Sequence, residues 1–199
     1  MPNRKPETRT RFKTSPEYNA LKEEKDLFRR RIYFLAFLTS KLSDKGVDAI
    51  IVGGQAIDLY TAGTFATSDI DLLVDNKKVT EIFLNKFGFK KQANGLWFNR
   101  ELVILIHVIS ESYNGDASRL RKIGVKKYEL KVAAPEDLIA NRLYSVKFWR
   151  SNPKLELEQS VALLKLFSDS IDNKYLDQVA KRDSTKDILA EARRYASKV

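Results

Sequence analysis

The chain has 199 residues, of which 43% are hydrophobic and 31% are charged, as is ordinary for a soluble globular protein. This length suits one well-packed domain with an appended helical part. No run of about 18 apolar residues and no secretory leader are recognisable, so we expect a cytoplasmic protein without membrane contact. The absence of cysteine excludes disulfides, thiolate metal sites and cysteine nucleophiles.

The charge is the strongest signal in the composition. The chain carries 36 Lys and Arg residues against 26 Asp and Glu residues, which gives a formal net charge of +10. Such an excess predicts an anionic partner, with nucleotide or nucleic acid such as RNA as the leading candidates. Lysine-rich surfaces are common, however, and we find no RNA-binding motif with interleaved aromatic residues. The charge therefore indicates association in general and no specific site.

Two contrasting segments precede the central part of the chain. Residues 1–16 carry five basic side chains, one glutamate and three prolines, and nothing among them can bury a core. This composition predicts a mobile basic tail. Residues 17–45 carry apolar residues three, four or seven positions apart, which predicts one long helix that ends at Gly46.

The most informative stretch runs from residue 50 to residue 74. An apolar run at 49–52 predicts a buried strand, and Gly53 and Gly54 follow it directly. Glycines free the backbone for a sharp turn and for the close approach of a ligand. Residues 55–60 are predicted to form a helix, whose unpaired N–H groups and dipole favour an anion at the turn.

Two carboxylates follow on one predicted strand. Side chains alternate along a strand, so Asp69 and Asp71 share one face, and the other face is apolar. Two carboxylates beside a phosphate-holding turn suit a divalent metal that also binds the phosphates of a nucleotide. The alternative is that both aspartates simply face water. Against this alternative, strands are poor in aspartate, and like charges on one face repel each other.

These residues resemble a known signature. The chain contains Gly53-Gly54-x-Ala56 followed by Thr67-x-Asp69-Ile70-Asp71-Leu72. These motifs resemble the signature of the nucleotidyltransferase superfamily, whose best-known member is DNA polymerase β. The resemblance is strongest to the small prokaryotic branch that includes antitoxin-associated and abortive-infection nucleotidyltransferases. It extends more weakly to the motif Pro135-Glu136-Asp137-Leu138-Ile139, and it covers residues 47–148.

The resemblance implies a fold and a reaction. The fold is α/β (α+β), with helices packed on a mixed β-sheet. In the reaction, an acceptor oxygen attacks the α-phosphorus of a nucleoside triphosphate (NTP) and releases pyrophosphate. Mg²⁺ or Mn²⁺ is the implied cofactor, and Asp69 and Asp71 are its implied ligands. The nucleotide is implied to contact Gly53 and Gly54 through its phosphates, with assistance from Thr67 or Ser68 and from Arg142 at the triphosphate.

The sequence departs from the family pattern at two positions. Phe65 stands where the branch often carries an arginine, and His107 stands where a third carboxylate is expected. His107, the only histidine, fits a metal ligand with altered metal preference, or a base that accepts the proton of the attacking hydroxyl. It equally fits a structural residue in a site without catalysis. Glu101 shares the predicted strand face of His107 and is an alternative third acid.

The remaining elements are predicted from local patterns. A helix at 77–87 ends at Gly88, and Asn94-Gly95 forms a hairpin turn. Pro135 begins a helix with acids in its first turn. The other expected elements are strands at 89–92, 96–99, 102–109 and 128–133, helices at 155–167 and 173–197, and a polar loop at 110–124 with Arg119, Arg121 and Lys122 as candidate phosphate contacts.

We therefore expect a nucleotidyltransferase-like core at residues 17–150 and a helical segment packed on it at residues 151–199. The expected function is metal-dependent transfer of a nucleoside monophosphate (NMP) from an NTP to an unidentified acceptor. The alternative is a catalytically degenerate fold that binds nucleic acid or a partner protein, for example in a toxin–antitoxin pair. A metal-dependent phosphohydrolase fits the sequence less well, because one histidine cannot form a His-Asp metal cluster.

Overall fold

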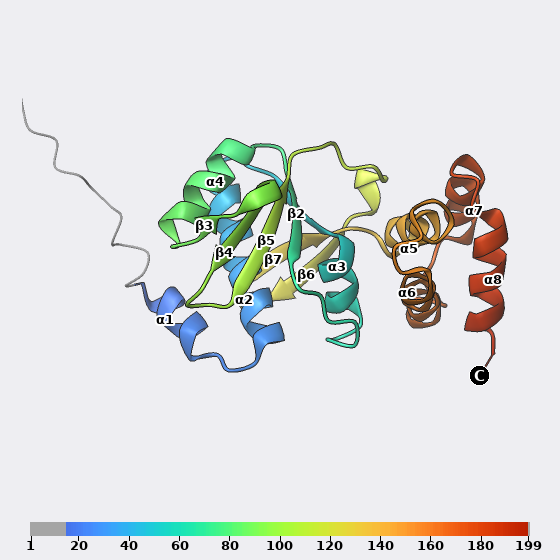
Figure 1. Cartoon of the computed structure of the whole chain (residues 1–199), viewed down its shortest axis with the longest axis horizontal. Helices are drawn as coiled ribbons and strands as arrows, with labels where there is room; N and C mark the ends of the chain where they lie inside the picture. Colours follow the sequence, from blue (N-terminus) through green and yellow to red (C-terminus); the bar gives the residue numbers. More distant parts are fainter. Residues whose placement is uncertain (1–14, 199) are drawn as a thin grey trace, which may run out of the picture. The chain divides into compact units, whose positions relative to one another are not determined.

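A computed structural model describes residues 15–198, which form seven strands and eight α-helices (Figure 1). The strands lie in one mixed sheet in the order β3-β4-β5-β2-β1-β7-β6, and this architecture confirms the predicted α/β fold class. They are β1 (Ala49–Val52), β2 (Ile70–Val74), β3 (Lys90–Lys91), β4 (Leu96–Asn99), β5 (Ile104–Ile109), β6 (Arg121–Val125) and β7 (Tyr128–Val132). The helices are α1 (Pro16–Glu23), α2 (Leu27–Ser43), α3 (Gly53–Tyr60), α4 (Lys77–Lys86), α5 (Pro135–Tyr144), α6 (Pro153–Leu166), α7 (Asn173–Arg182) and α8 (Lys186–Ala196).

The chain packs into two compact units. The first unit comprises the described residues of Met1–Ile50 together with Ser68–Ser112 and Lys122–Leu130. The second unit comprises Ile51–Thr67, Tyr113–Arg121 and the described residues of Lys131–Val199. Three of the boundaries between the units fall within strands, in β1, β6 and β7, so each of these strands contributes residues to both units.

Strands β2 and β5 pair in parallel in the first unit (Figure 1). In their register Asp71 lies opposite His107. Strand β4 pairs antiparallel with both β3 and β5. The turn between β3 and β4 carries Asn94 and Gly95 with φ of 56° and 77°, which confirms the predicted hairpin turn. Both residues adopt the left-handed conformation that asparagine and glycine tolerate best.

Aromatic side chains form the core beneath this part of the sheet. Phe34 and Phe37 come from α2, and Phe87 and Phe89 follow α4. The Phe34 ring centroid lies 5.0 Å from that of Phe89 and 6.0 Å from that of Phe87. The Phe37 ring lies edge-on to Phe87 at 5.2 Å. Burial of each ring contributes about 1.5–3 kcal/mol, so these contacts attach both helices firmly within the first unit.

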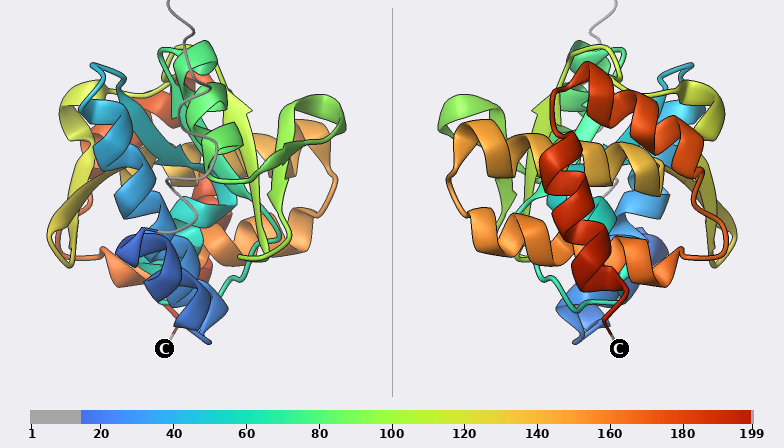
Figure 2. Two further views of the ribbon diagram at one scale, coloured as in Figure 1. Left: turned by 90° about the vertical axis from the view of Figure 1, so that its left-hand side faces the viewer. Right: turned by 90° about the vertical axis from the view of Figure 1, so that its right-hand side faces the viewer.

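The second unit contains the parallel contact of β1 with β7, where Ile51 lies opposite Val132. Tyr60 on α3 donates a hydrogen bond from its hydroxyl to the Ala133 carbonyl at 2.8 Å, and its ring lies edge-on to Phe167 at 5.1 Å. These contacts fix the end of α3 next to two segments, the one that follows β7 at Ala133 and the one that follows α6 at Phe167. Helices α6, α7 and α8 are drawn in orange and red in Figure 2.

The prediction of one helix over residues 17–45 is wrong, because α1 ends at Glu23 and α2 begins at Leu27. The Asp26 carboxylate accepts a hydrogen bond from the Arg29 N–H at 2.9 Å and caps α2. The Arg30 side chain donates from Nε to the Glu24 carbonyl at 2.8 Å, which satisfies the backbone at the break. Neither glycine nor proline marks this interruption in the sequence.

Two predictions in the C-terminal half also need correction. The single helix expected at 173–197 is two helices, because Ser184 adopts a left-handed conformation with φ of 57°. The Thr185 N–H then donates to the Ala180 carbonyl at 2.8 Å and closes α7. The loop expected at 110–124 contains a short helical turn at Ala117–Arg119 and strand β6. Three of the five residues of β6 are exposed, and only Ile123 and Val125 alternate as apolar residues, which is too short a pattern to identify a strand.

The predicted tail at 1–16 lies outside the described residues except for its last two positions. Ser15 accepts a hydrogen bond from the Tyr18 N–H at 3.2 Å, and Pro16 is the first residue of α1. The predicted division of the chain at residue 150 remains a prediction. Among residues 15–198, no helix combines the length and the apolar character that crossing a bilayer requires.

Candidate functional site

The two aspartates lie at the start of β2 in the first unit. The apolar residues of β2 are buried, whereas Asp71, which alternates with them, is half-buried. Asp69 directly precedes the strand, and the Ser68 hydroxyl donates a hydrogen bond to its Oδ1 at 3.1 Å. Asp71 thus alternates with the buried Ile70 and Leu72, whereas Asp69 lies just outside the strand that was predicted to contain it; both residues are only partly buried.

His107 lies beside Asp71 on the neighbouring strand. Its Nδ1 is 3.3 Å from Asp71 Oδ1, as the parallel register of β2 and β5 allows. A Cβ atom placed on Gly95 would lie 3.6 Å from His107 Cδ2 and 3.9 Å from Lys77 Nζ. The imidazole and the Lys77 amine therefore both lie next to Gly95, at ordinary van der Waals distances from its Cβ position. Sequence reasoning missed Lys77, because no motif distinguishes it from the other lysines.

The oxygen donors in this unit fit a divalent metal that arrives with a nucleotide. Within residues 15–198, no group of three or more His, Cys, Asp or Glu side chains is arranged to hold a metal ion. Mg²⁺, however, is commonly bound by one or two carboxylates together with substrate phosphates. Asp69 and Asp71 supply such a donor set, whereas His107 directs Nδ1 at Asp71.

The glycine turn between β1 and α3 belongs to the second unit. Gly53 has φ of 61°, a left-handed conformation that is costly for other residues. A Cβ atom on Gly54 would lie 3.0 Å from Thr67 Oγ1 and 3.9 Å from Arg142 Nη2. Gly54 therefore has to stay small for Thr67 to approach the turn. The second unit thus brings together four of the predicted nucleotide-binding residues.

Arg142 is held by an ion pair inside the second unit. Its Nε lies 3.3 Å from Glu156 Oε2, and the two side chains are only 14% and 16% exposed. A largely buried guanidinium needs a charged partner to offset its loss of hydration. Sequence reasoning missed Glu156, because α6 carries no functional motif around it.

The acids in the first turn of α5 make specific contacts in addition to favouring the helix dipole. Glu136 Oε1 accepts a hydrogen bond from the Asp172 N–H at 2.8 Å. Asp137 accepts hydrogen bonds from the hydroxyls of Tyr113 at 2.7 Å and Tyr175 at 2.6 Å. A Cβ atom on Gly115 would collide with the Asp137 carboxylate. These contacts hold the segment around Tyr113 and the start of α7 against α5.

Burial and the contact with Asp137 shift the acidity of both tyrosines. Desolvation, reinforced by the hydrogen bond to Asp137, raises the pKa of Tyr175 to about 12. The same causes, in the same order, raise the pKa of the more buried Tyr113 further. Both hydroxyls therefore remain protonated at neutral pH and act as hydrogen-bond donors to the carboxylate.

Two of the three candidate phosphate contacts in the 110–124 segment are engaged elsewhere. Arg119 pairs with Asp116 at 3.2 Å and with Asp172 at 2.9 Å, and its guanidinium lies 4.2 Å from the Tyr175 ring centroid. Lys122 pairs with Glu129 at 2.9 Å. These side chains have structural partners, so the expectation that they contact phosphate gains no support.

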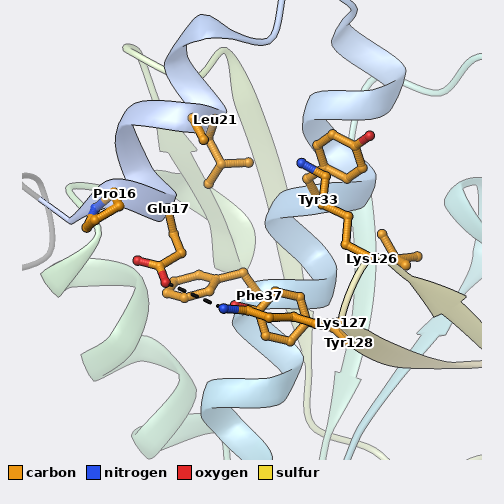
Figure 3. A pocket seen from close by; sticks show the side chains of 10 residues that line it. Pro16, Glu17, Leu21, Tyr33, Phe37, Lys126, Lys127 and Tyr128 are labelled. Atoms are coloured by element: carbon orange, nitrogen blue, oxygen red, sulfur yellow. Dashed lines mark ion pairs between the residues drawn. The ribbon is translucent and has the colours of Figure 1, made fainter.

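Glu101 does not occupy the strand position expected of a third acid. Strand β5 begins at Ile104, and Glu101 accepts a hydrogen bond from the Tyr18 hydroxyl at 3.2 Å. The first unit also contains an apolar pocket of about 360 Å³ (Figure 3). None of the predicted site residues lines it; its walls are Pro16, Glu17, Ala20, Leu21, Tyr33, Phe37, Val125, Lys126, Lys127 and Tyr128.

Comparisons with known proteins agree with the resemblance. Residues 32–88 match a family described as nucleotidyl transferase of unknown function (DUF2204). No curated protein sequence is significantly similar to the chain. The fold is similar to that of an antigenic nucleotidyltransferase-like protein from Paracoccidioides brasiliensis, with a TM-score of 0.58 and 16% identity over 86% of this chain and 94% of that one.

The fold is also similar to that of the antibiotic-resistance factor ANT(2'')-Ia. Its solution structure gives a TM-score of 0.55 at 13% identity over 83% of this chain and 97% of that one. A crystal structure of ANT(2'')-Ia in complex with adenylyl-2''-tobramycin gives 0.55 at 13% identity over 78% and 98%. The chain therefore has a nucleotidyltransferase-like fold, and its match to the family model spans β1, the glycine turn and β2.

Proposed function

We propose that the protein transfers an NMP group from an NTP to an acceptor hydroxyl in a metal-dependent reaction. The observation that carries the proposal is the register of β2 and β5, which places Asp71 opposite His107. Asp69 lies two residues before Asp71 in the sequence. In the transfer, the acceptor oxygen forms a bond to the α-phosphorus as the bond to the bridging β-phosphate oxygen breaks. The acceptor loses its hydroxyl proton, and pyrophosphate leaves.

The proposal assigns a role to each of the predicted site residues. Asp69 and Asp71 hold Mg²⁺ or Mn²⁺, which when bound neutralises charge on the phosphate oxygens. The backbone at Gly53 and Gly54 contacts phosphate, and the Arg142 guanidinium, fixed by Glu156, adds a positive charge beside this turn. Thr67 or Ser68 hydrogen-bonds the nucleotide.

His107 acts as the base in this proposal. When Nδ1–H donates to Asp71, Nε2 keeps its lone pair and accepts the proton of the attacking hydroxyl. The carboxylate fixes the orientation and tautomer of the ring. This role needs no third carboxylate among the metal ligands, and it explains why a histidine suits this position.

The reaction is tested by measuring pyrophosphate release from each of the four NTPs with Mg²⁺ or Mn²⁺. Candidate acceptors are RNA, protein and tobramycin. Tobramycin is included because an adenylyl derivative of it is bound in one of the similar structures. Release should disappear in Asp69→Asn/Asp71→Asn. His107→Ala should lower it about 10²–10⁴-fold, as expected for loss of a general base. Release that persists unchanged in the double variant would contradict the proposal.

A second function, binding of nucleic acid without transfer, is favoured by the excess of 36 basic over 26 acidic residues. In that case the net charge of +10 would supply the affinity. Affinity for nucleic acid would then fall steeply with salt, because each neutralised phosphate releases counterions. The two functions are separated by whether NTP turnover accompanies binding.

A further inference from the structure

Three aromatic side chains lie exposed at the end of α5 in the second unit. Tyr144, Phe148 and Trp149 are 37%, 48% and 66% exposed, respectively. The ring centroid of Tyr144 lies 4.6 Å from that of Phe148 and 5.9 Å from that of Trp149. Neighbouring apolar rings in water are unfavourable unless a partner covers them. We refer to these three residues as the aromatic cluster.

The backbone after α5 presents this cluster. Residues Ser145–Trp149 form a π-helical turn, in which the Arg150 N–H donates to the Ser145 carbonyl at 2.9 Å. Arg150 then adopts a left-handed conformation with φ of 53° and ends the turn. Such π-turns occur frequently at functional sites. Here the turn leaves the consecutive residues Phe148 and Trp149 both exposed, before the chain enters α6 (Figure 2, orange).

The same segment carries an excess of positive charge. Residues 142–154 include four basic residues and no acidic one. Two of the four are neutralised, since Arg142 pairs with Glu156 and Lys147 pairs with Asp187 at 2.8 Å. Arg150 and Lys154 are exposed, and across residues 15–198 neither has an ion-pair partner. Two available cations therefore lie next in sequence to the aromatic cluster.

We infer that the aromatic cluster, with Arg150 and Lys154, binds single-stranded nucleic acid. Aromatic rings stack on bases of any sequence, and cations beside them contact the phosphates. Only a single strand exposes its base faces, so the surface favours it over a duplex. A neutral protein partner could also cover the rings, but the two unpaired cations and the lack of acidic residues within 142–154 favour an anionic occupant. This binding is independent of the proposed transfer reaction.

The inference is tested by fluorescence anisotropy with fluorescein-labelled oligo(U) and oligo(A) RNA of about 12 nucleotides, within the usual range for such sites. Trp149→Ala should weaken binding about 5- to 140-fold, the loss expected for one stacked base. Arg150→Ala/Lys154→Ala should reduce the slope of log affinity against log salt by about 1.4, about 0.7 for each single-strand phosphate contact.

Matched controls separate this surface from general effects. Leu166→Ala removes another exposed apolar side chain, and Lys45→Ala/Lys90→Ala removes two exposed cations of the first unit. Both should bind RNA within about twofold of the wild type, since neither touches the proposed surface. RNA binding is measured without NTP or divalent metal, so failure of the transfer reaction leaves this inference intact.

Two results would overturn the inference. Equal RNA affinity of Trp149→Ala and Leu166→Ala would exclude stacking at the aromatic cluster. Absence of RNA binding by the wild type would exclude it as well. One form of this result is a wild-type dimer that binds no RNA and that Trp149→Ala converts into a monomer. In that case the cluster would be an interface between copies of this chain. Thermal melting of each variant confirms that it is folded, as expected for substitutions of exposed residues.

Discussion

At the residue scale, Gly53 and Gly54 are required for different physical reasons. Gly53 needs a positive φ, and Gly54 needs the absence of a Cβ atom next to Thr67. The sequence predicts a glycine turn here because two glycines follow an apolar run. It does not predict which glycine meets which requirement, since the contact of Gly54 with Thr67 depends on the path of the intervening loop.

The glycine turn leads to a prediction about stability. Gly53→Ala should lower the free energy of unfolding by about 1–2 kcal/mol, because alanine is strained at positive φ. Gly124→Ala is the matched control, because no atom lies within 4 Å of its Cβ position and its φ is outside the left-handed region. The control should change stability by less than about 0.5 kcal/mol. Urea denaturation measures both, and equal stability of the two variants would disprove the strain at Gly53.

His107 shows what a residue pattern can and cannot predict. The sequence places this histidine on a predicted strand without deciding its role, and the structure places its ring beside Asp71 on the less buried face of β5. Glu101 fits the same alternation but lies before the strand and contacts Tyr18. The start of a strand is set by pairing with its neighbours, which a local pattern does not contain. Lys77 and Glu156 were missed for the same reason, since each acts through a distant contact.

At the scale of elements, Asp137 ties three segments of the second unit together. Its carboxylate accepts hydrogen bonds from Tyr113 and from Tyr175 at the start of α7. The local sequence predicts only that an acid in the first turn of α5 favours the helix dipole. The tyrosines come from positions 24 residues before it and 38 residues after it, so no local pattern could identify them.

This arrangement predicts a loss of stability at alkaline pH. The pKa of Tyr175 is raised from 10.0 to about 12 in the folded protein, and that of Tyr113 is raised further. A raised folded-state pKa contributes stability that is complete below about pH 10. That contribution is lost as the pH rises through about 12. Urea denaturation should therefore show a falling free energy of unfolding across this range.

Asp137→Asn tests the source of this pH dependence. It should lower the free energy of unfolding by about 1–3 kcal/mol at neutral pH, because two buried hydroxyls lose a charged acceptor. It should also weaken the decline between about pH 10 and 12. Asp177→Asn is the control, since Asp177 only pairs with Arg193 at an exposed position and should cost less than about 1 kcal/mol. An unchanged alkaline decline in Asp137→Asn would refute the assignment.

The elements themselves were predicted unequally well. Strand β4, the hairpin turn and the start of α5 were confirmed, since alternation, Asn-Gly and proline are local signals. The breaks at residues 24–26 and 183–185 were missed because side-chain caps and one left-handed serine, rather than glycine or proline, create them. Strand β6 was missed because most of its residues are exposed and only two apolar residues, Ile123 and Val125, alternate along it.

At the scale of the whole molecule, the net charge of +10 gains a partial structural explanation. Several cations have carboxylate partners, as Arg119, Arg142 and Lys147 do. Arg150 and Lys154 do not pair with any described acid, and they adjoin the aromatic cluster. Composition alone predicts an anionic partner, but it cannot separate paired from unpaired cations. That distinction depends on ion pairs between residues far apart in the sequence, which a local pattern cannot predict.

The central claim is that Asp69 and Asp71 bind a metal together with a nucleotide. The most direct test is isothermal titration calorimetry with non-hydrolysable analogues of the four NTPs, with and without Mg²⁺ or Mn²⁺. We predict that the wild type and the control Asp44→Asn, which removes an exposed carboxylate elsewhere, bind at least one analogue only when metal is present. Asp69→Asn/Asp71→Asn should not bind it. Equal binding by the double variant, or no binding by the wild type under any condition, would contradict the claim.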